Sequence, residues 1–365
     1  ILTRLGFNFL TVPEQDVQDG RFPTVKSPNP ENAPALKMAV DLANKEGADI
    51  VIGTDPDCDR MGVGVRNAAG DMELLTGNQT GALIAWYRIR TMFDLGILNE
   101  SNRDHAVLLK TFVTSPMQDT IARTYGIHVV NTLTGFKWIS SKLAAYEDAL
   151  PEDIRSRYRD LTPAESRAAR LEHSRFMVLG DEESYGYMGD DFSRDKCGNS
   201  GVVMFAELAA YAASRGLTVS GLLDEIYAEV GYFLEVNQSK VFEGAQGAAQ
   251  IAALANSYAA HPPQEVDGSA VSGVRNFASD TIYDEEGAVV PKEKMLFVDL
   301  ADGRSFAVRP SGTEPKIKYY LFGRQTPARD ATMTADELAA AKKKVTGSLE
   351  SLWSWIEADI DTRLS

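Results

Sequence analysis

The segment at residues 54–60, Thr-Asp-Pro-Asp-Cys-Asp-Arg, carries three carboxylates on alternate residues: Asp55, Asp57 and Asp59. Carboxylates at this spacing repel one another unless a hard cation lies among them, and oxygen ligands suit Mg²⁺ better than zinc or copper. Arg60 follows directly and adds a fixed positive charge that suits phosphate. This acidic loop therefore predicts a metal ion next to a phosphate group.

The acidic loop follows the apolar run at residues 50–53. A buried strand ending there is expected to place the cation at the carboxyl edge of a parallel sheet, where α/β enzymes bind ligands. An EF-hand calcium loop is excluded, because Arg60 replaces the turn glycine and Arg66 replaces the bidentate glutamate. A phosphatase with Asp55 as nucleophile and Asp181 in a second acidic motif stays open.

Two further loops have compositions that suit a sugar phosphate. The sugar loop, residues 180–187, reads Gly-Asp-Glu-Glu-Ser-Tyr-Gly-Tyr. Its carboxylates and hydroxyl can bind vicinal sugar hydroxyls, and a tyrosine ring can pack on a sugar face. The phosphate loop, residues 309–318, reads Arg-Pro-Ser-Gly-Thr-Glu-Pro-Lys-Ile-Lys. Its hydroxyls flank a glycine between Arg309 and Lys318, which predicts a docking site for a phosphate that is held rather than transferred.

The bulk properties are those of a globular protein that does not bind nucleic acid. The 365 residues exceed what one core usually serves, so two or three domains are expected. A net charge of −15 argues against a nucleic-acid binder. No apolar run is long enough to span a membrane, and Cys58 and Cys197 lie in loops rich in glycine and aspartate. We expect a reduced, cytoplasmic protein with no membrane partner.

The elements that must position the loops alternate between strand and helix. Strands are predicted at residues 8–12, 49–53, 61–65, 106–109, 127–130, 176–179, 295–300, 305–308 and 317–322. Helices are predicted at residues 37–47, 81–90, 200–215, 220–230, 246–258 and 335–360, with two more after residues 116 and 135. Residues 147–175 are expected to form a solvated helical insertion. The pattern predicts mixed, mostly parallel-sheet α/β domains followed by a C-terminal α+β domain.

The three loops, in this order, resemble those of the α-D-phosphohexomutase family, and the resemblance covers essentially the whole chain. Family members have four domains around one cleft, which contribute in order a phosphoserine loop, a Mg²⁺ loop, a sugar-selecting loop with Glu-x-Ser, and a phosphate-binding loop. The resemblance implies a metal-binding domain at residues 1–78, a sugar-binding domain at residues 79–234 and a phosphate-binding domain at residues 235–365. The sugar loop looks like that of the phosphoglucomutase and phosphopentomutase branch.

The resemblance also implies roles for individual residues. The three aspartates of the acidic loop would hold Mg²⁺, and Arg60 and Lys196 would lie next to the transferring phosphoryl group as catalytic residues. Glu182 and Ser184 would bind sugar hydroxyls. The remaining residues implied to bind the substrate, a sugar phosphate or sugar bisphosphate, are Thr134, Gly135, Lys137, Arg309, Ser311, Gly312, Thr313 and Lys318.

The nucleophile of the family does not occur in these 365 residues. The family's serine lies in a Ser-His-Asn-Pro context, whereas none of the four histidines here follows a serine, and residues 27–30 read Ser-Pro-Asn-Pro. We therefore expect an N-terminally incomplete fragment, inactive alone, whose partner is the phosphoserine domain of the same protein. The implied reaction interconverts sugar 1-phosphate and 6-phosphate, or pentose 1- and 5-phosphate, through a bisphosphate. A non-catalytic sugar-phosphate-binding protein is the remaining alternative.

Overall fold

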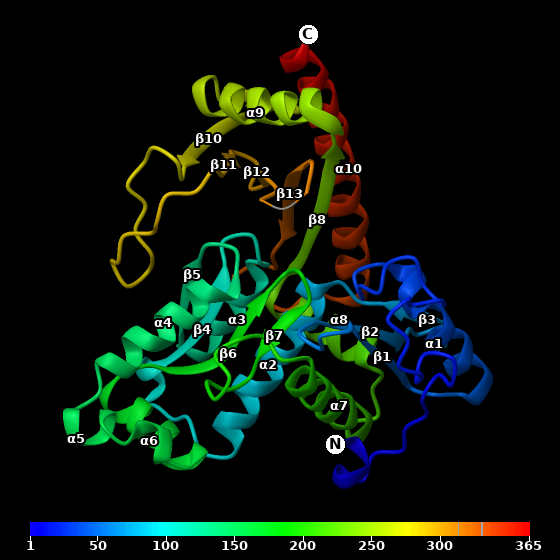
Figure 1. Cartoon of the computed structure of the whole chain (residues 1–365), viewed down its shortest axis with the longest axis vertical. Coiled ribbons are helices and arrows are strands. Elements are labelled where there is room, and N and C mark those ends of the chain that lie inside the picture. Colours follow the sequence, from blue (N-terminus) through cyan, green and yellow to red (C-terminus); the bar gives the residue numbers. More distant parts are fainter. Residues whose placement is uncertain (313, 330) are drawn as a thin grey trace. The chain divides into compact units, whose positions relative to one another are not determined.

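The computed structural model describes residues 1–312, 314–329 and 331–365, and it divides into two compact units (Figure 1). Unit 1 comprises residues 1–114 and 118–225, and unit 2 comprises residues 115–117 and 226–365. Unit 1 holds two sheets and unit 2 holds one. The predicted combination of α/β elements with a C-terminal α+β region is confirmed.

The first sheet of unit 1 is small and antiparallel, in the order β1-β2-β3. Its elements, with the preceding helical segments, are η1 (Leu2–Leu5), α1 (Ala33–Glu46), β1 (Ile50–Thr54), β2 (Met61–Arg66) and β3 (Met72–Leu74). Helix α1 ends at Gly47, whose φ of 72° is readily adopted only by glycine. The strand predicted at residues 8–12 was wrong, because that segment pairs with no strand of the described chain.

The placement of the acidic loop at a parallel-sheet edge was also wrong. Strands β1 and β2 pair antiparallel, with Ile50 opposite Val65 and Thr54 opposite Met61, so the loop is a hairpin connection. The physical reason is its length: parallel neighbours need a crossover of about a dozen residues or more, and six residues separate these two strands. The acidic loop therefore lies at the end of a two-stranded hairpin.

The second sheet of unit 1 is parallel over three strands and has the order β5-β4-β6-β7. Its strands are β4 (Ala106–Thr111), β5 (His128–Thr132), β6 (Phe176–Glu182) and the antiparallel β7 (Gly186–Met188). The associated helices are α2 (Gly77–Asp94), η2 (Arg103–His105), α3 (Met117–Tyr125), α4 (Phe136–Asp148), α5 (Glu152–Arg155), η3 (Tyr158–Asp160), α6 (Pro163–His173), α7 (Gly198–Ser214) and α8 (Val219–Val230). Every residue of β4 is buried, as expected for a central parallel strand.

Two local expectations for this region need correction. Strand β6 runs on to Glu182, and Gly180, Asp181 and Glu182 pair with β7, so only residues 183–185 form a turn. The insertion at residues 147–175 is helical as predicted, but it is not merely solvated, because Tyr158 and Arg170 are buried. Each of these two side chains contacts the other, as described below.

Unit 2 is built on one antiparallel sheet of order β8-β13-β12-β11-β10-β9. Its elements are β8 (Tyr232–Val241), α9 (Gly244–Ala260), β9 (Glu265–Val266), β10 (Ser269–Asn276), β11 (Leu296–Leu300), β12 (Ser305–Pro310), β13 (Lys316–Gln325) and α10 (Ala335–Leu364). Helix α10 begins with a capping box between Thr334 and Glu337 and packs along β13 and β8 (Figure 1). Its buried stripe is Leu338, Ala341, Val345, Leu349, Leu352, Ile356 and Ile360.

No single helix of the described chain is long and apolar enough to cross a membrane. Helices α7 and α8 meet the length and composition test only when taken together, and they are bent by 84° at the break between them.

Candidate active site

The three carboxylates of the acidic loop converge at the end of the β1–β2 hairpin. One oxygen of each of Asp55, Asp57 and Asp59 lies within 4.8 Å of the others. Asp55 is buried, Asp59 is half-buried and Asp57 is exposed, so the cluster opens to solvent on one side. A set of oxygen donors with one open side fits a hard cation that also binds a phosphate oxygen.

Asp55 is held in place by Arg60 and by the backbone of the loop. Its Oδ1 accepts hydrogen bonds from the backbone N–H of Asp59 at 3.1 Å and of Arg60 at 3.0 Å. Its Oδ2 accepts from Nε of Arg60 at 2.7 Å. Burial alone would raise the pKa of Asp55, but these hydrogen bonds and the Arg60 charge lower the pKa below its usual value. Asp55 is therefore a fixed anion at neutral pH.

Asp59 lies between two cations. Its Oδ2 is 2.8 Å from Nζ of Lys196, and its Oδ1 is 3.5 Å from Nε of Arg60. Burial raises the pKa of Asp59, and the Lys196 ammonium opposes that rise. The Oδ1 atom is buried and accepts no hydrogen bond from the residues that the structure describes. A buried carboxylate oxygen that accepts no hydrogen bond is well suited to be a ligand of a cation.

The acidic loop is held by two neighbouring segments through contacts that the sequence did not predict. The carbonyl of Cys58, a residue with φ of 55°, accepts a hydrogen bond from Gly198 N–H at 2.8 Å. The Met61 N–H donates to the Tyr185 carbonyl at 3.0 Å. A Cβ at Gly198 would lie 2.8 Å from the Cys58 carbonyl oxygen, so only glycine fits there without a shift. Contacts from helix α7 and from the sugar loop thus fix the shape of the acidic loop that carries the three carboxylates.

The sugar loop brings Glu182 against the start of α4. The buried Glu182 accepts a hydrogen bond from Gly135 N–H at 2.5 Å, and Gly135 has φ of 112°. Thr134 Oγ1 is buried without a hydrogen-bond partner among the described residues, whereas Lys137 is exposed and lies over the Trp138 ring. Ser184 is half-buried in the turn between β6 and β7. Glu182 and Gly135 are therefore neighbours, as one binding surface requires.

A buried acid lies behind this surface. Asp181 is 1% exposed, and its Oδ2 accepts from Nε2 of Gln118 at 2.7 Å. Burial raises the pKa of Asp181 to about 7, opposed by that hydrogen bond and by the nearby Lys110. The close approach of Gly81 leaves no room for a Cβ. The sequence places Asp181 in a second acidic motif, but nothing in the local sequence indicates that this carboxyl group is buried.

The phosphate loop lies in unit 2 and forms the β12–β13 hairpin. Arg309 and Lys318 are directly opposite each other, so both cations are on one face of the sheet. Like charges at such positions repel unless an anion lies between them. Arg309 already bonds Glu293 through its Nε at 2.5 Å, which outweighs the effect of burial and raises the pKa of Arg309. Lys318 forms no ion pair within the described ranges.

The tip of this hairpin, residues 311–315, is held by its own contacts and by a hydrogen bond from Phe242 N–H to the Pro315 carbonyl at 2.9 Å. Ser311 N–H donates to the Lys316 carbonyl at 2.9 Å, and Glu314 N–H donates to Ser311 Oγ at 3.3 Å. Lys316 also pairs with Glu314 at 2.8 Å. Gly312 is exposed, and Thr313 lies outside the described residues. Each unit thus gathers its own set of predicted residues: the metal and sugar residues in unit 1, and the phosphate residues in unit 2.

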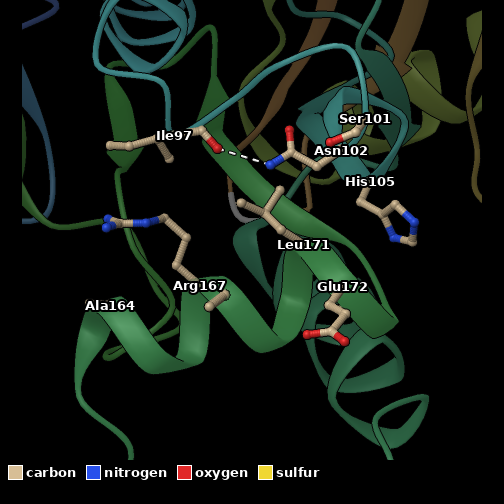
Figure 2. A pocket seen from close by; sticks show the side chains of 9 residues that line it. Ile97, Ser101, Asn102, His105, Ala164, Arg167, Leu171 and Glu172 are labelled. Carbon is tan, nitrogen blue, oxygen red and sulfur yellow. Dashed lines mark hydrogen bonds between the residues drawn. The ribbon is translucent and has the colours of Figure 1, made fainter.

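A hollow of about 540 Å³ in unit 1 lies apart from these residues (Figure 2). It is bordered by α6, through Ala164, Arg167 and Leu171, and by the segment that contains Asn102 and His105. Figure 2 shows the His105 ring and the Arg167 guanidinium pointing in different directions, so their charges do not converge on one ligand. None of the predicted site residues lines this hollow.

Comparison with known protein families gives three consecutive matches. Residues 1–70 match the model for "Phosphoglucomutase/phosphomannomutase, alpha/beta/alpha domain II", and residues 76–230 match the model for "alpha/beta/alpha domain III" of the same family. Residues 239–341 match the model for its C-terminal domain.

Individual proteins are similar over most of the chain. Phosphoglucomutase of Staphylococcus aureus strain USA300 is 32% identical over 327 residues, which are 88% of this chain and 53% of that protein, and strain N315 gives the same identity over 326 residues. The open form of the Paramecium phosphoglucomutase pp63/parafusin aligns with a TM-score of 0.51 at 18% identity, covering 92% of this chain and 50% of that one, which indicates a shared fold. The chain spans about half the length of the curated relatives it matches.

Proposed function

The chain belongs to the α-D-phosphohexomutase superfamily, and on this basis we propose that it supplies the metal, sugar and phosphate loops of a phosphoglucomutase-type enzyme. The proposed reaction interconverts sugar 1-phosphate and 6-phosphate, or pentose 1- and 5-phosphate, through a bisphosphate and a phosphoserine on a further domain of the same protein. The three proposed domains are residues 1–78, 79–234 and 235–365, which the separate family matches support.

The observation that carries the proposal is the contact between the acidic cluster and two cations. Arg60 bonds Asp55 at 2.7 Å and Lys196 bonds Asp59 at 2.8 Å, so positive groups lie next to the proposed ligands. A transferring phosphoryl group carries charge on several oxygens at once, and it needs several cationic groups around it. Arg60 of the acidic loop and Lys196 of the segment before α7 supply two such cationic groups next to the three carboxylates.

In the proposed site, Asp55, Asp57 and Asp59 would hold Mg²⁺, and each residue around them has a defined task. Bound Mg²⁺ supplies neutralisation of charge on the phosphoryl oxygens. Arg60 and Lys196 would bind the same oxygens, since both are anchored by carboxylates rather than free in solvent. Catalysis would then rest on positioning and electrostatics.

Substrate recognition would be divided between the two units. Glu182 would accept hydrogen bonds from sugar hydroxyls, and Ser184 could both donate and accept them. Thr134, Gly135 and Lys137 would contribute to the same site from the adjoining turn. In unit 2, the non-reacting phosphate would lie between Arg309 and Lys318, where their register places two positive charges side by side. Ser311, Gly312 and Thr313 would contribute hydroxyl and backbone N–H donors to the same phosphate.

The aspartyl-phosphatase alternative is less consistent with the geometry. A nucleophilic carboxylate must reach its substrate, but the side chain of Asp55 is 1% exposed and both of its oxygens accept hydrogen bonds. The second acid of that hypothesis, Asp181, is fully enclosed behind the sugar loop. The phosphatase would also leave the paired cations Arg309 and Lys318 without a role.

Ligand binding by the purified chain is the first test. Titration calorimetry with Mg²⁺ and glucose 1,6-bisphosphate, and in parallel with ribose 1,5-bisphosphate, is expected to show binding that Asp57→Ala weakens about tenfold or more. Asp153→Ala, which removes an exposed carboxylate from α5, is the matched control and should leave the affinity unchanged. Equal affinity in the wild type and Asp57→Ala would contradict the metal-assisted site.

Reaction products provide the second test. The chain alone, incubated with glucose 1-phosphate, bisphosphate and Mg²⁺, is expected to form no glucose 6-phosphate, because the Ser-His-Asn-Pro context is not among its residues. Release of inorganic phosphate that Asp55→Asn abolishes would favour the phosphatase instead. Mass spectrometry of the natural protein, followed by the same assay, separates a complete mutase from a non-catalytic binding protein.

A further inference from the structure

The segment between β7 and α7, residues 189–197, carries Lys196 and is here called the lysine loop. Both of its ends are fixed by backbone contacts. Arg88, a half-buried residue, donates from Nε to the Val178 carbonyl and from Nη2 to the Gly189 carbonyl, each at 2.7 Å. At the other end, Cys197 N–H donates to the Tyr187 carbonyl at 3.0 Å. These contacts hold Gly189 and Cys197, and the residues between them are held by other contacts.

A buried charge cluster holds the interior of the lysine loop. Arg170 of α6 is 3% exposed, and its Nη2 donates to Oδ2 of Asp191 at 2.8 Å. The Tyr158 hydroxyl donates to the same oxygen at 2.8 Å and accepts from Nε of Arg170 at 2.8 Å. The guanidinium carbon of Arg170 also lies 4.9 Å from the centre of the Tyr158 ring. These three side chains form a closed triangle, with every edge a hydrogen bond.

A second contact fixes the loop three residues further on. Arg194 has φ of 52°, a conformation that is uncommon for residues with a side chain. Its guanidinium bonds Glu147 at the end of α4 and lies 3.6 Å from Oδ2 of Asp191, while its carbonyl accepts a hydrogen bond from Ser140. Only the tip around Phe192, which is 68% exposed, extends away from these anchors. Lys196 follows Arg194 by two residues.

We propose that Arg170, acting through Asp191, is a positioning residue that sets Lys196 against Asp59. The proposal rests on the role of Lys196 in the proposed function and adds a residue from a helix that forms none of the three motif loops. A long lysine side chain is flexible, so the direction of its ammonium depends on where its backbone is held. The triangle fixes that backbone, and Lys196 then reaches Asp59 at 2.8 Å.

The chemistry of the triangle favours a positioning role over a purely stabilising one. A buried ion pair contributes little net stability compared with apolar residues of the same volume, since both charges lose their hydration. It does impose a single geometry, because a planar guanidinium bonds only where its donors point. Arg170 thereby ties α6 and the helical insertion to the acidic loop, although α6 contacts no metal ligand in the structure described here.

The test is a double-mutant cycle on the purified chain with Mn²⁺ as the probe, followed by electron paramagnetic resonance. Lys196→Ala removes a positive charge next to Asp59 and should tighten Mn²⁺ binding about fivefold to tenfold. Arg170→Lys keeps the charge but loses the planar guanidinium that holds Tyr158 and Asp191 in one geometry, and should shift the affinity in the same direction by a smaller factor. In the Lys196→Ala background, Arg170→Lys should cause no further shift.

A control variant, a second measurement and a substitute variant accompany the double-mutant cycle. Arg167→Lys makes the same substitution at an arginine on the same helix that borders the hollow in Figure 2, and it keeps the positive charge that acts on Asp190, so Mn²⁺ affinity should stay at the wild-type value. Amide hydrogen exchange of residues 189–197 should accelerate in Arg170→Lys and not in Lys196→Ala. If Arg170→Lys does not fold, Arg194→Ala replaces it in the cycle, because Glu147 keeps Arg159 as a partner at 3.1 Å.

An Arg170→Lys shift that persists at full size without Lys196 would overturn the proposal, as would wild-type exchange rates in the lysine loop. Failure of the mutase proposal is recognised separately. If the wild-type chain binds no sugar bisphosphate but the Mn²⁺ cycle is non-additive, the positioning role stands and the proposed substrate does not. If the bisphosphate binds and the cycle is additive, the mutase proposal stands and the positioning role does not.

Discussion

The acidic loop and the phosphate loop are both hairpin connections between antiparallel strands, but their charges are held by different means. In the acidic loop, Asp55 is buried and bonds three donors, and neighbouring segments bond Cys58 and Met61. In the phosphate loop, the tip at residues 311–315 bonds itself and the adjoining Lys316, and it accepts one backbone hydrogen bond from another segment, from Phe242 N–H to the Pro315 carbonyl at 2.9 Å. The acidic loop is therefore shaped by several neighbouring segments, and the phosphate loop mainly by its own hairpin.

This difference indicates what each loop is prepared to bind. Fixed carboxylates form a site whose geometry exists before the ligand arrives, so little reorganisation accompanies binding of a small cation. Two cations on adjacent strands would recognise a phosphate mainly by charge. A site that must accept either phosphate of a sugar bisphosphate would benefit from the second kind of loop.

The largest effect is expected from Asp55→Ala, which breaks the anchoring of the acidic loop. The substitution removes the acceptor of two backbone N–H groups of the loop and the nearest acceptor of the Arg60 guanidinium. We expect the free energy of unfolding to fall by about 3–5 kcal/mol and Mn²⁺ affinity to fall at least about a hundredfold. Urea denaturation and Mn²⁺ titration measure the two quantities.

Asp57→Ala is the matched control for that substitution. Asp57 belongs to the same cluster but is exposed. It should therefore lose metal affinity while the free energy of unfolding changes by less than about 0.5 kcal/mol. Equal losses of stability in Asp55→Ala and Asp57→Ala would contradict the view that the buried Asp55 anchors the acidic loop.

The second effect concerns pH and sharpens the contrast between the units. Asp181 in unit 1 has a folded pKa of about 7 against an unfolded value of 3.8, so the folded state binds the proton more tightly. Its stabilising contribution is complete below about pH 4 and is lost as the pH rises through 7. Asp181→Asn should remove this dependence and raise the free energy of unfolding at pH 8 by up to about 4 kcal/mol.

Thermal unfolding of the wild type and Asp181→Asn between about pH 4 and pH 8 measures this difference. The two proteins should be similar at about pH 4 and diverge above it, with the variant the more stable. No charged side chain of unit 2 is buried to the same degree within the described residues, so the transition of unit 2 should not follow this pattern. A constant difference at every pH would contradict the raised pKa.

The third effect separates the two cations of the phosphate loop. Lys318→Ala should weaken binding of glucose 1,6-bisphosphate about tenfold with almost no loss of stability, since Lys318 has no ion-pair partner in the described chain. Arg309→Ala should lower both the affinity and the free energy of unfolding, the latter by about 1–2 kcal/mol, because it leaves the half-buried Glu293 unpaired. Identical stability losses would indicate that Glu293 does not anchor Arg309.

Sequence reasoning predicted the residues of both loops more reliably than their structural setting. The alternate aspartates and the flanking cations follow from local chemistry, and the structure brings Asp55, Asp57, Asp59, Arg60 and Lys196 together. The sheet direction at the acidic loop was mistaken, although the six-residue connection was already visible and excludes a parallel crossover. The six-residue connection is a stronger indication of strand direction than the general preference of α/β folds for parallel sheets.

The contacts from distant segments could not be predicted from the sequence. Nothing in the sequence links Gly198 to Cys58 or Arg170 to Asp191, because each pair depends on how helices pack after the strands have formed. The insertion that contains Arg170 was expected to be solvated, since its arginines and glutamates are typical of an exposed helix. Buried charge pairs of this kind become visible only when tertiary structure is known.

The smallest effects are expected from two glycines, one in each setting. Gly198→Ala places a Cβ 2.8 Å from the Cys58 carbonyl oxygen and should cost about 1 kcal/mol, because the clamp on the acidic loop must shift. Gly312→Ala meets no atom within 4 Å and lies at a backbone conformation that alanine accepts, so stability should change by less than about 0.5 kcal/mol. Urea denaturation and bisphosphate titration of both variants complete the comparison. A large stability loss at Gly312 would contradict the view that the phosphate loop is shaped mainly by its own hairpin. A loss of affinity without a loss of stability would instead mean that the absent side chain leaves room for the phosphate.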